Sequence, residues 1–430
     1  MLVTPKIRSN ICLNAHPAGC AQEVRRQIEY VKAKKAVRAG EEWFKKNKTA
    51  VDLLNDSKTI NSSDNGNDAG FRTDVGPGCV LVIGCSTGYG LASRIAAAFE
   101  YGADTIGVSF EKEGTETRGG TPGFYNNMAF DKEAKAADVN SITINGDAYS
   151  HEIKKRVIEE IKKLGKKVDL VIYSLASPVR TDPDTQVMYK SVIKPIGRTY
   201  EGKCLDIIAE KLTEAKAEPA TEEEIATTVK VMGGADWKLW IDALADSGCL
   251  ATGCTTLAYS YIGPELSHAI YRDGTIGEAK KDLEKTAREL DLDLQKKNRG
   301  HAYVSVNKGL VTRSSAVIPV ISLYLACLFK VMKANGTHEG CIEQMERLFA
   351  EKLYAGGEVP LDDEKRIRMD DLELTGEVQK ATVANMNAVT EENMAEYCDL
   401  AGYKHDFLSA NGFDVDGVDY GLEVERFDLV

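Results

Sequence analysis

The sequence lacks the cysteine and histidine patterns that bind metal ions or build a disulfide framework. Its ten cysteines and six histidines are scattered, and they form no CxxC pair, no cluster at zinc spacing and no HExxH motif. We therefore expect reduced thiols, most of them buried as small apolar residues, and no metal site.

Long apolar runs are also missing. The longest, residues 316–329, is too short to span a bilayer and contains Pro319 and Ser322, so it predicts a buried helix. The first residues have neither the apolar core of a signal peptide nor the Arg- and Ser-rich composition of a transit peptide. These features predict a cytoplasmic protein with no membrane partner.

Positive charge is scarce relative to negative charge. The 430 residues include 54 Lys and Arg against 66 Asp and Glu, which gives a formal net charge of −12. This balance argues against a nucleic-acid partner, whose phosphates would be repelled. It does not argue against a phosphorylated cofactor, because a helix N-terminus and a few local cations can hold phosphate in an acidic protein.

What the sequence does contain, from residue 79 onward, is an alternation of apolar runs of strand length with helical patterns. The expected strands are 79–84, 105–110, 141–144, 170–174, 255–261 and 302–307. The expected helices are 91–100, 126–137, 151–164, 222–246, 265–271 and 275–292. Continuous apolar runs suit strands that are covered on both faces, so the pattern predicts an α/β fold with a doubly wound, mostly parallel Rossmann-type sheet.

Two regions depart from this alternation. A charged helical pattern over 22–54 leads into residues 57–74, whose Asn, Asp, Ser and Gly predict a mobile polar insertion before the first core strand. After Val331 we expect no strand, and 339–354 and 376–388 look helical. The expected organisation is a single domain of residues 1–430 in three parts: helix plus insertion at 22–76, a Rossmann core at 77–331, and a helical C-terminal cap at 332–430.

A glycine-rich segment, Gly84-Cys-Ser-Thr-Gly88-Tyr-Gly90, falls between the first expected strand and the first expected helix. Glycines at such a turn let the backbone approach a pyrophosphate, and the helix dipole favours its negative charge. The spacing differs from GxGxxG and is typical of short-chain-type reductases. Glu111 follows the second strand, where a carboxylate accepts hydrogen bonds from the ribose hydroxyls and repels a 2′-phosphate, which favours NADH over NADPH.

Two further strand ends suit the same cofactor. Asp147 and Ala148 follow the third strand, where a carboxylate can hold the adenine amino group. Leu175 and Ala176 follow the fourth, where small neighbours leave room for the nicotinamide ribose. Ligands of open α/β sheets bind beyond the carboxyl ends of the strands, so we expect these segments to line one crevice.

Tyr271 and Lys280 form a candidate catalytic pair. A phenol beside an ammonium is a common arrangement for acid catalysis at a carbonyl. On one continuous helix, a spacing of nine residues places two side chains on opposite sides, because each residue turns the helix by about 100°. Asp273-Gly274 predicts a break, and Thr275 to Glu278 predict a capping box that opens a new helix. Taken alone, the pair favours a half-exposed tyrosine and a solvated lysine over a catalytic pair; the nucleotide site reverses that preference.

Several segments together resemble a known family. They are residues 10–17, 84–90, 107–112, 173–183, 258–264, 308–312 and 402–412. With Tyr271-x8-Lys280, they resemble the trans-2-enoyl-CoA reductase family, which includes the type V enoyl-acyl-carrier-protein reductases. The resemblance covers nearly the whole chain, and the extra polar residues around 39–76 depart from it.

The resemblance implies roles for individual residues. It makes Tyr271 the proton donor, Lys280 a partner of the cofactor's ribose and phosphate, and Tyr261 a contact of the substrate thioester. The residues that it assigns to NADH, besides Lys280, are Gly84, Cys85, Ser86, Thr87, Gly88, Tyr89, Phe110, Glu111, Asp147, Ala148, Leu175, Ala176, Leu310, Val311 and Thr312.

It also implies the reaction: an NADH-dependent reduction of a short trans-2-enoyl-CoA, such as crotonyl-CoA to butyryl-CoA, in fatty-acid metabolism. Reduction of an enoyl-acyl-carrier-protein is an alternative that the motifs do not separate, and a dinucleotide-binding sensor without turnover is a more remote one. We expect a monomer or a homodimer. Residues 314–329 are a candidate wall for the acyl chain, with plain core packing as the alternative.

Overall fold

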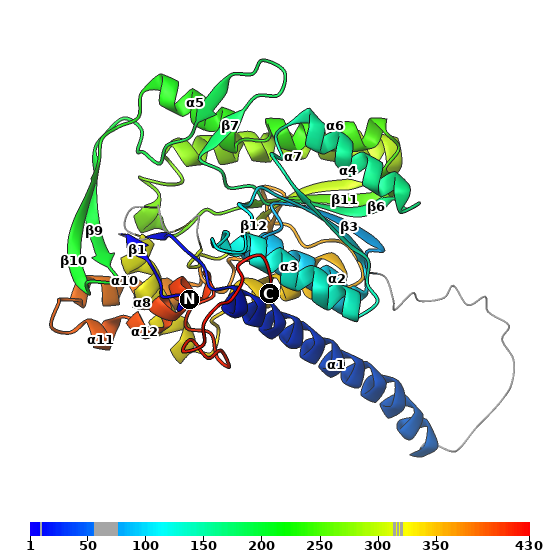
Figure 1. Cartoon of the computed structure of the whole chain (residues 1–430), viewed down its shortest axis with the longest axis horizontal. Coiled ribbons are helices and arrows are strands. Elements are labelled where there is room, and N and C mark those ends of the chain that lie inside the picture. Colours follow the sequence, from blue (N-terminus) through cyan, green and yellow to red (C-terminus); the bar gives the residue numbers. More distant parts are fainter. Residues whose placement is uncertain (9–10, 56–75, 313–314, 316–317, 319–320) are drawn as a thin grey trace, which may run out of the picture.

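Among the residues that the structure describes, seven parallel strands form one central sheet, in the order β13-β12-β11-β6-β3-β4-β5 (Figure 1). The computed structural model describes residues 1–8, 11–55, 76–312, 315, 318 and 321–430, and only the backbone of 41–55. The strands are β3 (Cys79–Ile83), β4 (Asp104–Ser109), β5 (Ser141–Asn145), β6 (Val168–Tyr173), β11 (Leu250–Ser260), β12 (His301–Val306) and β13 (Arg366–Arg368). This order is the doubly wound arrangement that the alternating pattern predicted.

Helices connect the strands and cover the sheet. They are α1 (Pro17–Asn55), α2 (Gly88–Tyr101), α3 (Pro122–Ala136), α4 (His151–Lys163), α5 (Glu222–Met232), α6 (Ala235–Asp246), α7 (Thr275–Asn298), α8 (Ile321–Ala334), α9 (Cys341–Arg347), α10 (Gly376–Ala388), α11 (Met394–Tyr397) and α12 (Leu400–Ser409), with a 3-10 turn η1 (Glu265–Ser267) and a π-helical turn η3 (Leu348–Leu353). Figure 1 shows α4, α6 and α7 on one side of the sheet and α1, α2 and α3 on the other.

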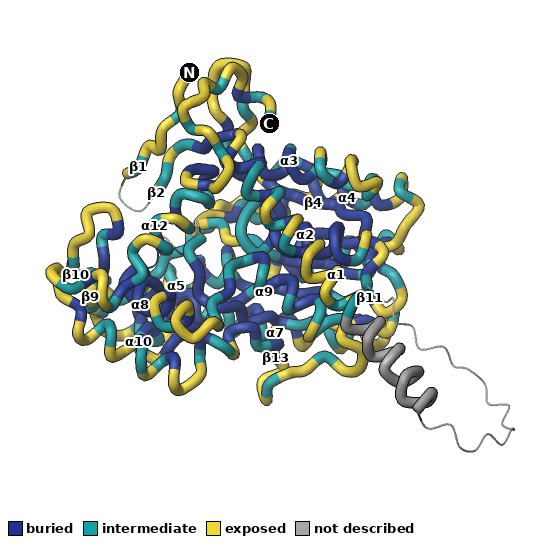
Figure 2. Tube along the Cα trace, turned by 90° about the horizontal axis from the view of Figure 1, so that it is seen from below, coloured by how far each residue is buried: buried dark blue, intermediate teal, exposed yellow. Residues whose placement is uncertain are grey.

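Alternate side chains of β3 belong to two separate cores. Leu81 and Ile83 pack with residues of α4, α6 and α7, whereas Val80 and Val82 pack with residues of α1, α2, α3 and α9. All four side chains are fully buried. Successive strand residues point to opposite faces, so an apolar run without polar gaps requires helices on both faces. The buried layer runs through the middle of the molecule in Figure 2.

The C-terminal helices form a third core beside the sheet. Their apolar side chains surround α8, with Val378 from α10, Met394 from α11 and Tyr403 and Phe407 from α12. The two ends of the chain meet nearby, since the Met1 amino group donates a hydrogen bond to the Val424 carbonyl at 3.0 Å. This part of the chain is therefore packed onto the core rather than separate from it.

The expectation that no strand follows Val331 was wrong. Residues Arg366–Arg368 form β13, which pairs in parallel with β12 and places Ile367 in the core. A three-residue strand with two arginines offers no apolar run to detect. Its charges are paired instead, because Arg366 and Arg368 both contact Asp362.

Two expected helices also differ from the structure. The helix expected over 222–246 is divided into α5 and α6 at Gly233-Gly234, where a Cβ on Gly234 would lie 2.1 Å from Thr286 Oγ1 of α7. The helix expected over 265–271 is the short turn η1 followed by irregular turns. Close packing on α7 explains the first break, and it cannot be seen in a pattern of local apolarity.

Within the described residues, three antiparallel strand pairs that the sequence pattern did not predict lie outside the central sheet. They are β1 (Ile7–Arg8) with β2 (Ile11–Cys12), β7 (Val179–Thr181) with β8 (Met188–Lys190), and β9 (Tyr200–Asp206) with β10 (Lys211–Ala217). Their strands are very short or rich in charged residues, so no apolar run marks them. Leu205 and Ile207 anchor the longest hairpin in the third core.

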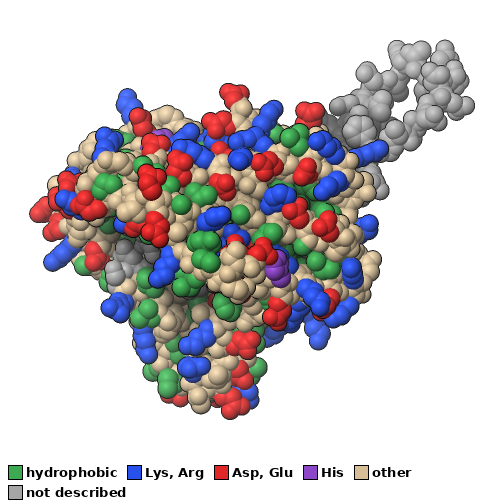
Figure 3. All heavy atoms as spheres, turned by 90° about the horizontal axis from the view of Figure 1, so that it is seen from above, with side chains coloured by type: hydrophobic (Ala, Val, Ile, Leu, Met, Phe, Trp, Pro, Cys, Tyr) green, Lys and Arg blue, Asp and Glu red, His purple; other side chains and the backbone are tan. Residues whose placement is uncertain are grey.

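The polar insertion expected at 57–74 lies outside the described residues, and so does part of the 314–329 segment. The helical pattern before the insertion is confirmed as α1, and the end of the apolar segment as α8. In the part of the chain that the structure describes, no helix is long and apolar enough to cross a membrane. On the face in Figure 3, acidic and basic side chains are interspersed.

A buried ion pair joins two of the helices on one face of the sheet. Lys154 of α4 donates to Asp236 of α6 at 2.7 Å, and their side chains are 3% and 1% exposed. Lys154 also donates to the carbonyls of Ala148 and Tyr149, and Asp236 accepts from the Tyr173 hydroxyl. The pair thus fixes the loop after β5 against α6.

Replacing Lys154 with Met should lower the free energy of unfolding by about 3–5 kcal/mol, because Asp236 is left buried without its counter-charge. The control is Lys238→Met, which breaks the half-exposed Lys238–Asp242 pair within α6 and should cost less than about 1 kcal/mol. Urea unfolding followed by circular dichroism measures both. Equal losses would show that the buried pair contributes no more than a surface pair.

Candidate active site

The glycine-rich turn connects β3 to α2 and packs against the end of β6. Gly84 has φ of +90°, and a Cβ there would lie 2.3 Å from the Ser174 carbonyl oxygen. A Cβ on Gly90 would lie 1.9 Å from the Gly84 carbonyl oxygen. Only glycine fits these positions. Thr87, at the N-cap of α2, makes no capping bond with its side chain, so the first turn of α2 retains N–H groups that suit an anion.

The turn is hydrogen-bonded to the ends of the neighbouring strands. Ser86 Oγ donates to Glu111 Oε1 at 2.6 Å, and Asn126 Nδ2 donates to the Ser86 carbonyl at 2.9 Å. The Glu111 backbone exchanges two hydrogen bonds with the Asn145 side chain, at 2.8 and 2.9 Å. The ends of β3, β4 and β5 therefore form one connected edge.

The other expected cofactor residues after β3 and β4 differ in exposure. Phe110 is 79% exposed, so its ring is available to a ligand. Cys85 is fully buried, and burial raises the pKa of its thiol to about 11, so only its backbone is available to a ligand at the turn. The Tyr89 hydroxyl donates to the Lys308 carbonyl, which ties the turn to the segment after β12.

The segments after β6 and β12 approach the glycine-rich turn. A Cβ on Gly84 would lie 3.3 Å from Leu175 Cδ2, and one on Gly88 would lie 3.9 Å from Thr312 Cγ2. The Asp147 carboxylate accepts from the Tyr149 N–H at 3.0 Å. Beyond these, Ala148 and Leu310 are buried, Val311 is half-buried and Ala176 is exposed. The structure thus gathers most of the expected cofactor residues around the turn.

Two tyrosines meet near the end of β11. Tyr261 directly follows the strand, and its ring centroid lies 5.2 Å from that of Tyr271 in an edge-to-face arrangement. Tyr271 is 8% exposed, and burial raises the pKa of its phenol. The phenol therefore stays protonated at neutral pH and is able to donate a hydrogen bond.

Lys280 reaches the same strand from α7. Its ammonium donates to the Tyr259 carbonyl at 3.1 Å, and burial lowers its pKa to about 8. In the described part of the chain, it makes this hydrogen bond rather than one to Tyr271. Both expected catalytic residues thus lie at the end of β11, and each is shifted by burial toward its neutral form.

The expected break between Tyr271 and Lys280 is present, but its capping differs from the prediction. Gly274, and not Thr275, is the N-cap of α7. The Thr275 hydroxyl instead donates to the Val192 carbonyl and accepts from the Lys194 N–H. This hydroxyl therefore fastens the start of α7 to the segment after β8, which no local pattern reveals.

A buried carboxylate that the sequence did not single out lies behind Tyr261. Glu373 is fully buried and accepts from the hydroxyl of Tyr261 at 3.3 Å, from the hydroxyl of Tyr324 at 2.6 Å and from the Gly309 N–H at 2.6 Å. It precedes α10 in an acidic segment, more than a hundred residues from Tyr261. No motif marks it, and only its burial reveals it.

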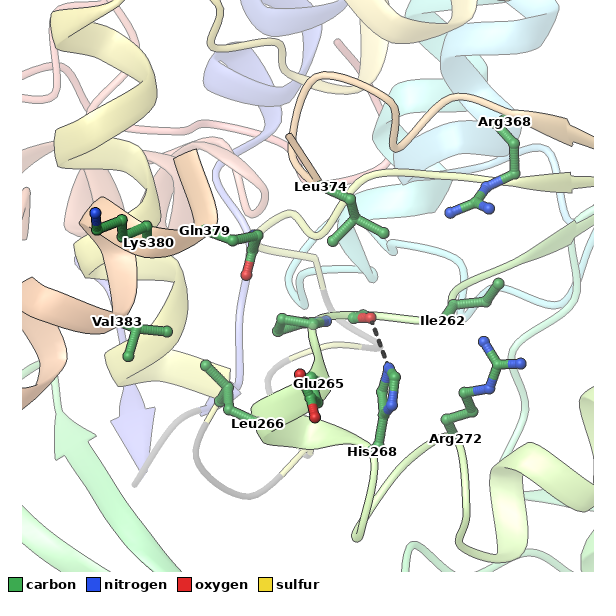
Figure 4. Close-up of a pocket in the computed structure, with 12 residues that line it drawn as sticks. Ile262, Glu265, Leu266, His268, Arg272, Arg368, Leu374, Gln379, Lys380 and Val383 are labelled. Carbon is green, nitrogen blue, oxygen red and sulfur yellow. Dashed lines mark hydrogen bonds between the residues drawn. The ribbon is translucent and has the colours of Figure 1, made fainter. Parts of the chain in front are cut away.

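A cleft of about 480 Å³ opens between the loop after β11 and α10 (Figure 4). Arg272, Arg368 and Lys380 line it, together with the carboxylate of Glu265. Arg368 is paired with Asp370, whereas the described structure gives Arg272 and Lys380 no acidic partner. Arg272 directly follows Tyr271, so the cleft adjoins the tyrosine pair.

The fold and the glycine-rich turn between β3 and α2 define a dinucleotide-binding protein of the doubly wound α/β class. Three family models match the chain. They are described as the NAD(P)H binding domain of trans-2-enoyl-CoA reductase at residues 2–47 and 56–116, the trans-2-enoyl-CoA reductase catalytic region at 118–354, and an enoyl reductase FAD binding domain at 361–424. The chain belongs to the trans-2-enoyl-CoA reductase family.

Individual relatives match over their whole length. The chain is 57% identical to a trans-2-enoyl-CoA reductase [NADH] of Treponema denticola, with 100% of both chains covered. It is 49% identical to an enoyl-[acyl-carrier-protein] reductase [NADH] of Flavobacterium johnsoniae, covering 99% of this chain and 98% of that one. The crystal structure of the Treponema denticola trans-2-enoyl-CoA reductase in complex with NAD matches with a TM-score of 0.90, 56% identity and full coverage of both chains.

Residues 361–424 do not fit the flavin dinucleotide named in their family description. This segment, all of it described, contains β13 and the helices α10, α11 and α12, without a glycine-rich turn from strand to helix. The apolar faces of its helices are packed on α8. These apolar helix faces are therefore not available to a flavin.

Gly277, in the first turn of α7, lets the helix pack closely against the backbone of the turn that follows Tyr271. A Cβ there would lie 1.7 Å from the Arg272 carbonyl oxygen, so Gly277→Ala should lower the free energy of unfolding by about 1–3 kcal/mol. The control Gly376→Ala places its Cβ in open space at the start of α10 and should be neutral or stabilising by up to about 1 kcal/mol. Chemical unfolding compares the two variants; similar values would contradict the proposed crowding.

Proposed function

We propose that the protein reduces the trans-2 double bond of a short enoyl thioester with NADH, as in the conversion of crotonyl-CoA to butyryl-CoA. The observation that carries this proposal is the tyrosine pair, Tyr261 and Tyr271, beside a glycine-rich turn that suits a dinucleotide. The names of the full-length relatives, NADH-dependent reductases of enoyl-CoA and of enoyl-acyl-carrier-protein, support it.

The turn suits NADH because its glycines let the backbone approach a pyrophosphate and because α2 begins there. In this proposal the backbone of residues 84–89 holds the pyrophosphate, and Glu111 holds the adenosine ribose. Phe110, Asp147 and Ala148 contact the adenine end. The residues proposed around the nicotinamide end are Leu175, Ala176, Lys280, Leu310, Val311 and Thr312.

When bound, NADH supplies the hydride that goes to the β-carbon of the enoyl group. Negative charge then develops on the thioester oxygen, and hydrogen-bond donors placed there stabilise it. Tyr271 is the proposed proton donor, since burial keeps its phenol protonated. Tyr261 is the proposed second donor to the thioester oxygen. Lys280, whose pKa burial lowers to about 8, is the proposed partner of the nicotinamide ribose.

The cleft in Figure 4 is the proposed place for the carrier of the acyl group. Arg272 and Lys380 have no acidic partner in the described structure, and they suit phosphate groups such as those of coenzyme A or of phosphopantetheine. Both carriers have this chemistry, so an enoyl-acyl-carrier-protein stays a second candidate substrate, favoured by the Flavobacterium johnsoniae relative.

For the domain organisation, we propose a single reductase domain over residues 1–430. The helix and insertion at 22–76 precede a Rossmann core at 77–331, and residues 332–430 cap it. The hydrogen bond between Tyr261 of the core and Glu373 of the cap supports one cooperative unit. In this division the cap also provides the edge strand β13.

Turnover with a panel of enoyl thioesters tests the proposed function. The full chain is mixed with NADH and with crotonyl esters of coenzyme A and of acyl carrier protein, and the fall in NADH absorbance is followed. We expect NADH oxidation with formation of the saturated thioester, and the faster ester identifies the carrier. NADH binding without oxidation by any ester would contradict the proposal and favour a sensor.

Tyr271→Phe removes the proposed proton donor and should lower kcat by about 100-fold or more. NADH affinity should change little, because the phenol is assigned to the substrate. Steady-state kinetics and fluorescence titration with NADH measure the two quantities. Tyr303→Phe is the control, a half-buried tyrosine on β12 outside the proposed site. Undiminished turnover in Tyr271→Phe would remove this residue from the mechanism.

Glu111→Ala removes the carboxylate that would repel a 2′-phosphate. The ratio of kcat/KM for NADPH to that for NADH should rise by about tenfold or more, which corresponds to about 1.4 kcal/mol. Glu113→Ala removes an exposed carboxylate two residues further on and should leave the ratio unchanged. A Glu111→Ala ratio equal to that of the wild type would assign the cofactor preference to other residues.

A further inference from the structure

The carboxyl group of Glu373 lies buried next to Tyr261, one member of the tyrosine pair. It is fully buried and receives hydrogen bonds from three parts of the chain: Tyr261 after β11, Tyr324 of α8 and Gly309 after β12. Gln379 fixes it further by donating to the Tyr324 hydroxyl at 2.9 Å and to the Glu373 carbonyl at 2.8 Å. These bonds hold the carboxyl group of Glu373 from three separate segments of the chain.

The three hydrogen bonds at this carboxyl group are unequal. Tyr324 and the Gly309 N–H lie at 2.6 Å from its oxygens, whereas Tyr261 lies at 3.3 Å. The longest bond is therefore the one to the residue with a proposed role at the thioester. Glu373 keeps two short bonds if Tyr261 turns its proton elsewhere.

Tyr261 can donate a hydrogen bond to the thioester oxygen only if its proton is not already donated to Glu373. A phenol has a single proton and cannot donate it to Glu373 and to a thioester oxygen at once. With Glu373 protonated, the carboxyl O–H donates to the phenol oxygen, and the phenol proton is free. Burial raises the pKa of Glu373 and so favours this form, although the nearby ammonium of Lys308 opposes it.

We propose that Glu373 is a positioning residue for Tyr261. Its carboxyl group holds the phenol oxygen beside Tyr271 and, as a carboxylic acid, donates to that oxygen, which leaves the phenol proton for the thioester oxygen. The inference rests on the proposed enoyl thioester reduction and assigns a role in it to the C-terminal part of the chain.

The proposal distinguishes two substitutions of similar size. Glu373→Gln reproduces the protonated acid, because its amide oxygen can accept from Gly309 while its NH₂ group donates to the phenols. It should retain at least about half of the wild-type kcat with crotonyl-CoA. Glu373→Leu offers no hydrogen bond and should lower kcat by about tenfold or more, with NADH affinity within about twofold of the wild type.

A double-mutant cycle separates positioning of Tyr261 from a general loss of structure. In a Tyr261→Phe background, Glu373→Leu should lower kcat no further, because the phenol that it positions is already absent. Glu339→Gln is the control for the loss of a buried carboxylate, since Glu339 is bonded to Arg347 and to no residue of the site. Thermal melts confirm that each variant is folded.

Several outcomes would overturn the inference. It fails if Glu373→Leu lowers kcat equally in both backgrounds, or if this variant matches the wild type. If Glu373→Leu does not fold, the test rests on Glu373→Gln. A folded Glu373→Gln variant with a kcat as low as that of Tyr261→Phe would contradict the proposal. A wild-type protein without turnover would remove the proposed function itself, whereas wild-type turnover with any of the other results removes only the role of Glu373.

Discussion

The parallel direction of the strands is the constraint on which the site depends. Parallel strands must be joined by crossover helices, so all their carboxyl ends meet at one edge. At that edge the close approach of Gly84 to Ser174 brings the ends of β3 and β6 into direct contact, and Asn145 joins the ends of β4 and β5. A crevice for a dinucleotide follows from this topology before any catalytic side chain is considered.

The site also depends on the C-terminal part of the chain. Tyr261 directly follows β11 of the sheet, yet its hydroxyl is bonded to Glu373, which follows the edge strand β13. Tyr324 and Gln379 complete the same network. The C-terminal helices therefore do more than cover apolar surface, because they supply the polar wall against which one of the two tyrosines rests.

Most of the sheet could be predicted because its signal is local. Continuous apolar runs such as that of β3 and the glycines after it mark the strands, the turn and the crevice. Local patterns failed where tertiary contacts decide: at Gly234, which packs on α7, at Thr275, which bonds to another loop, and at β13, which has no apolar run. Glu373 could not be predicted for the same reason, because a sequence does not show which carboxyl group of an acidic segment is buried.

The turn between Tyr271 and α7 also has a consequence for how this sequence can vary. Gly274 caps the helix, Gly277 touches the Arg272 carbonyl, and Lys280 points to β11 from the second turn. One residue added within α7 before Lys280 would rotate it by about 100° away from the strand. The number of residues between Tyr271 and Lys280 is thus fixed, because the rotation of α7 decides where Lys280 points. This stretch should therefore tolerate substitutions far better than insertions or deletions.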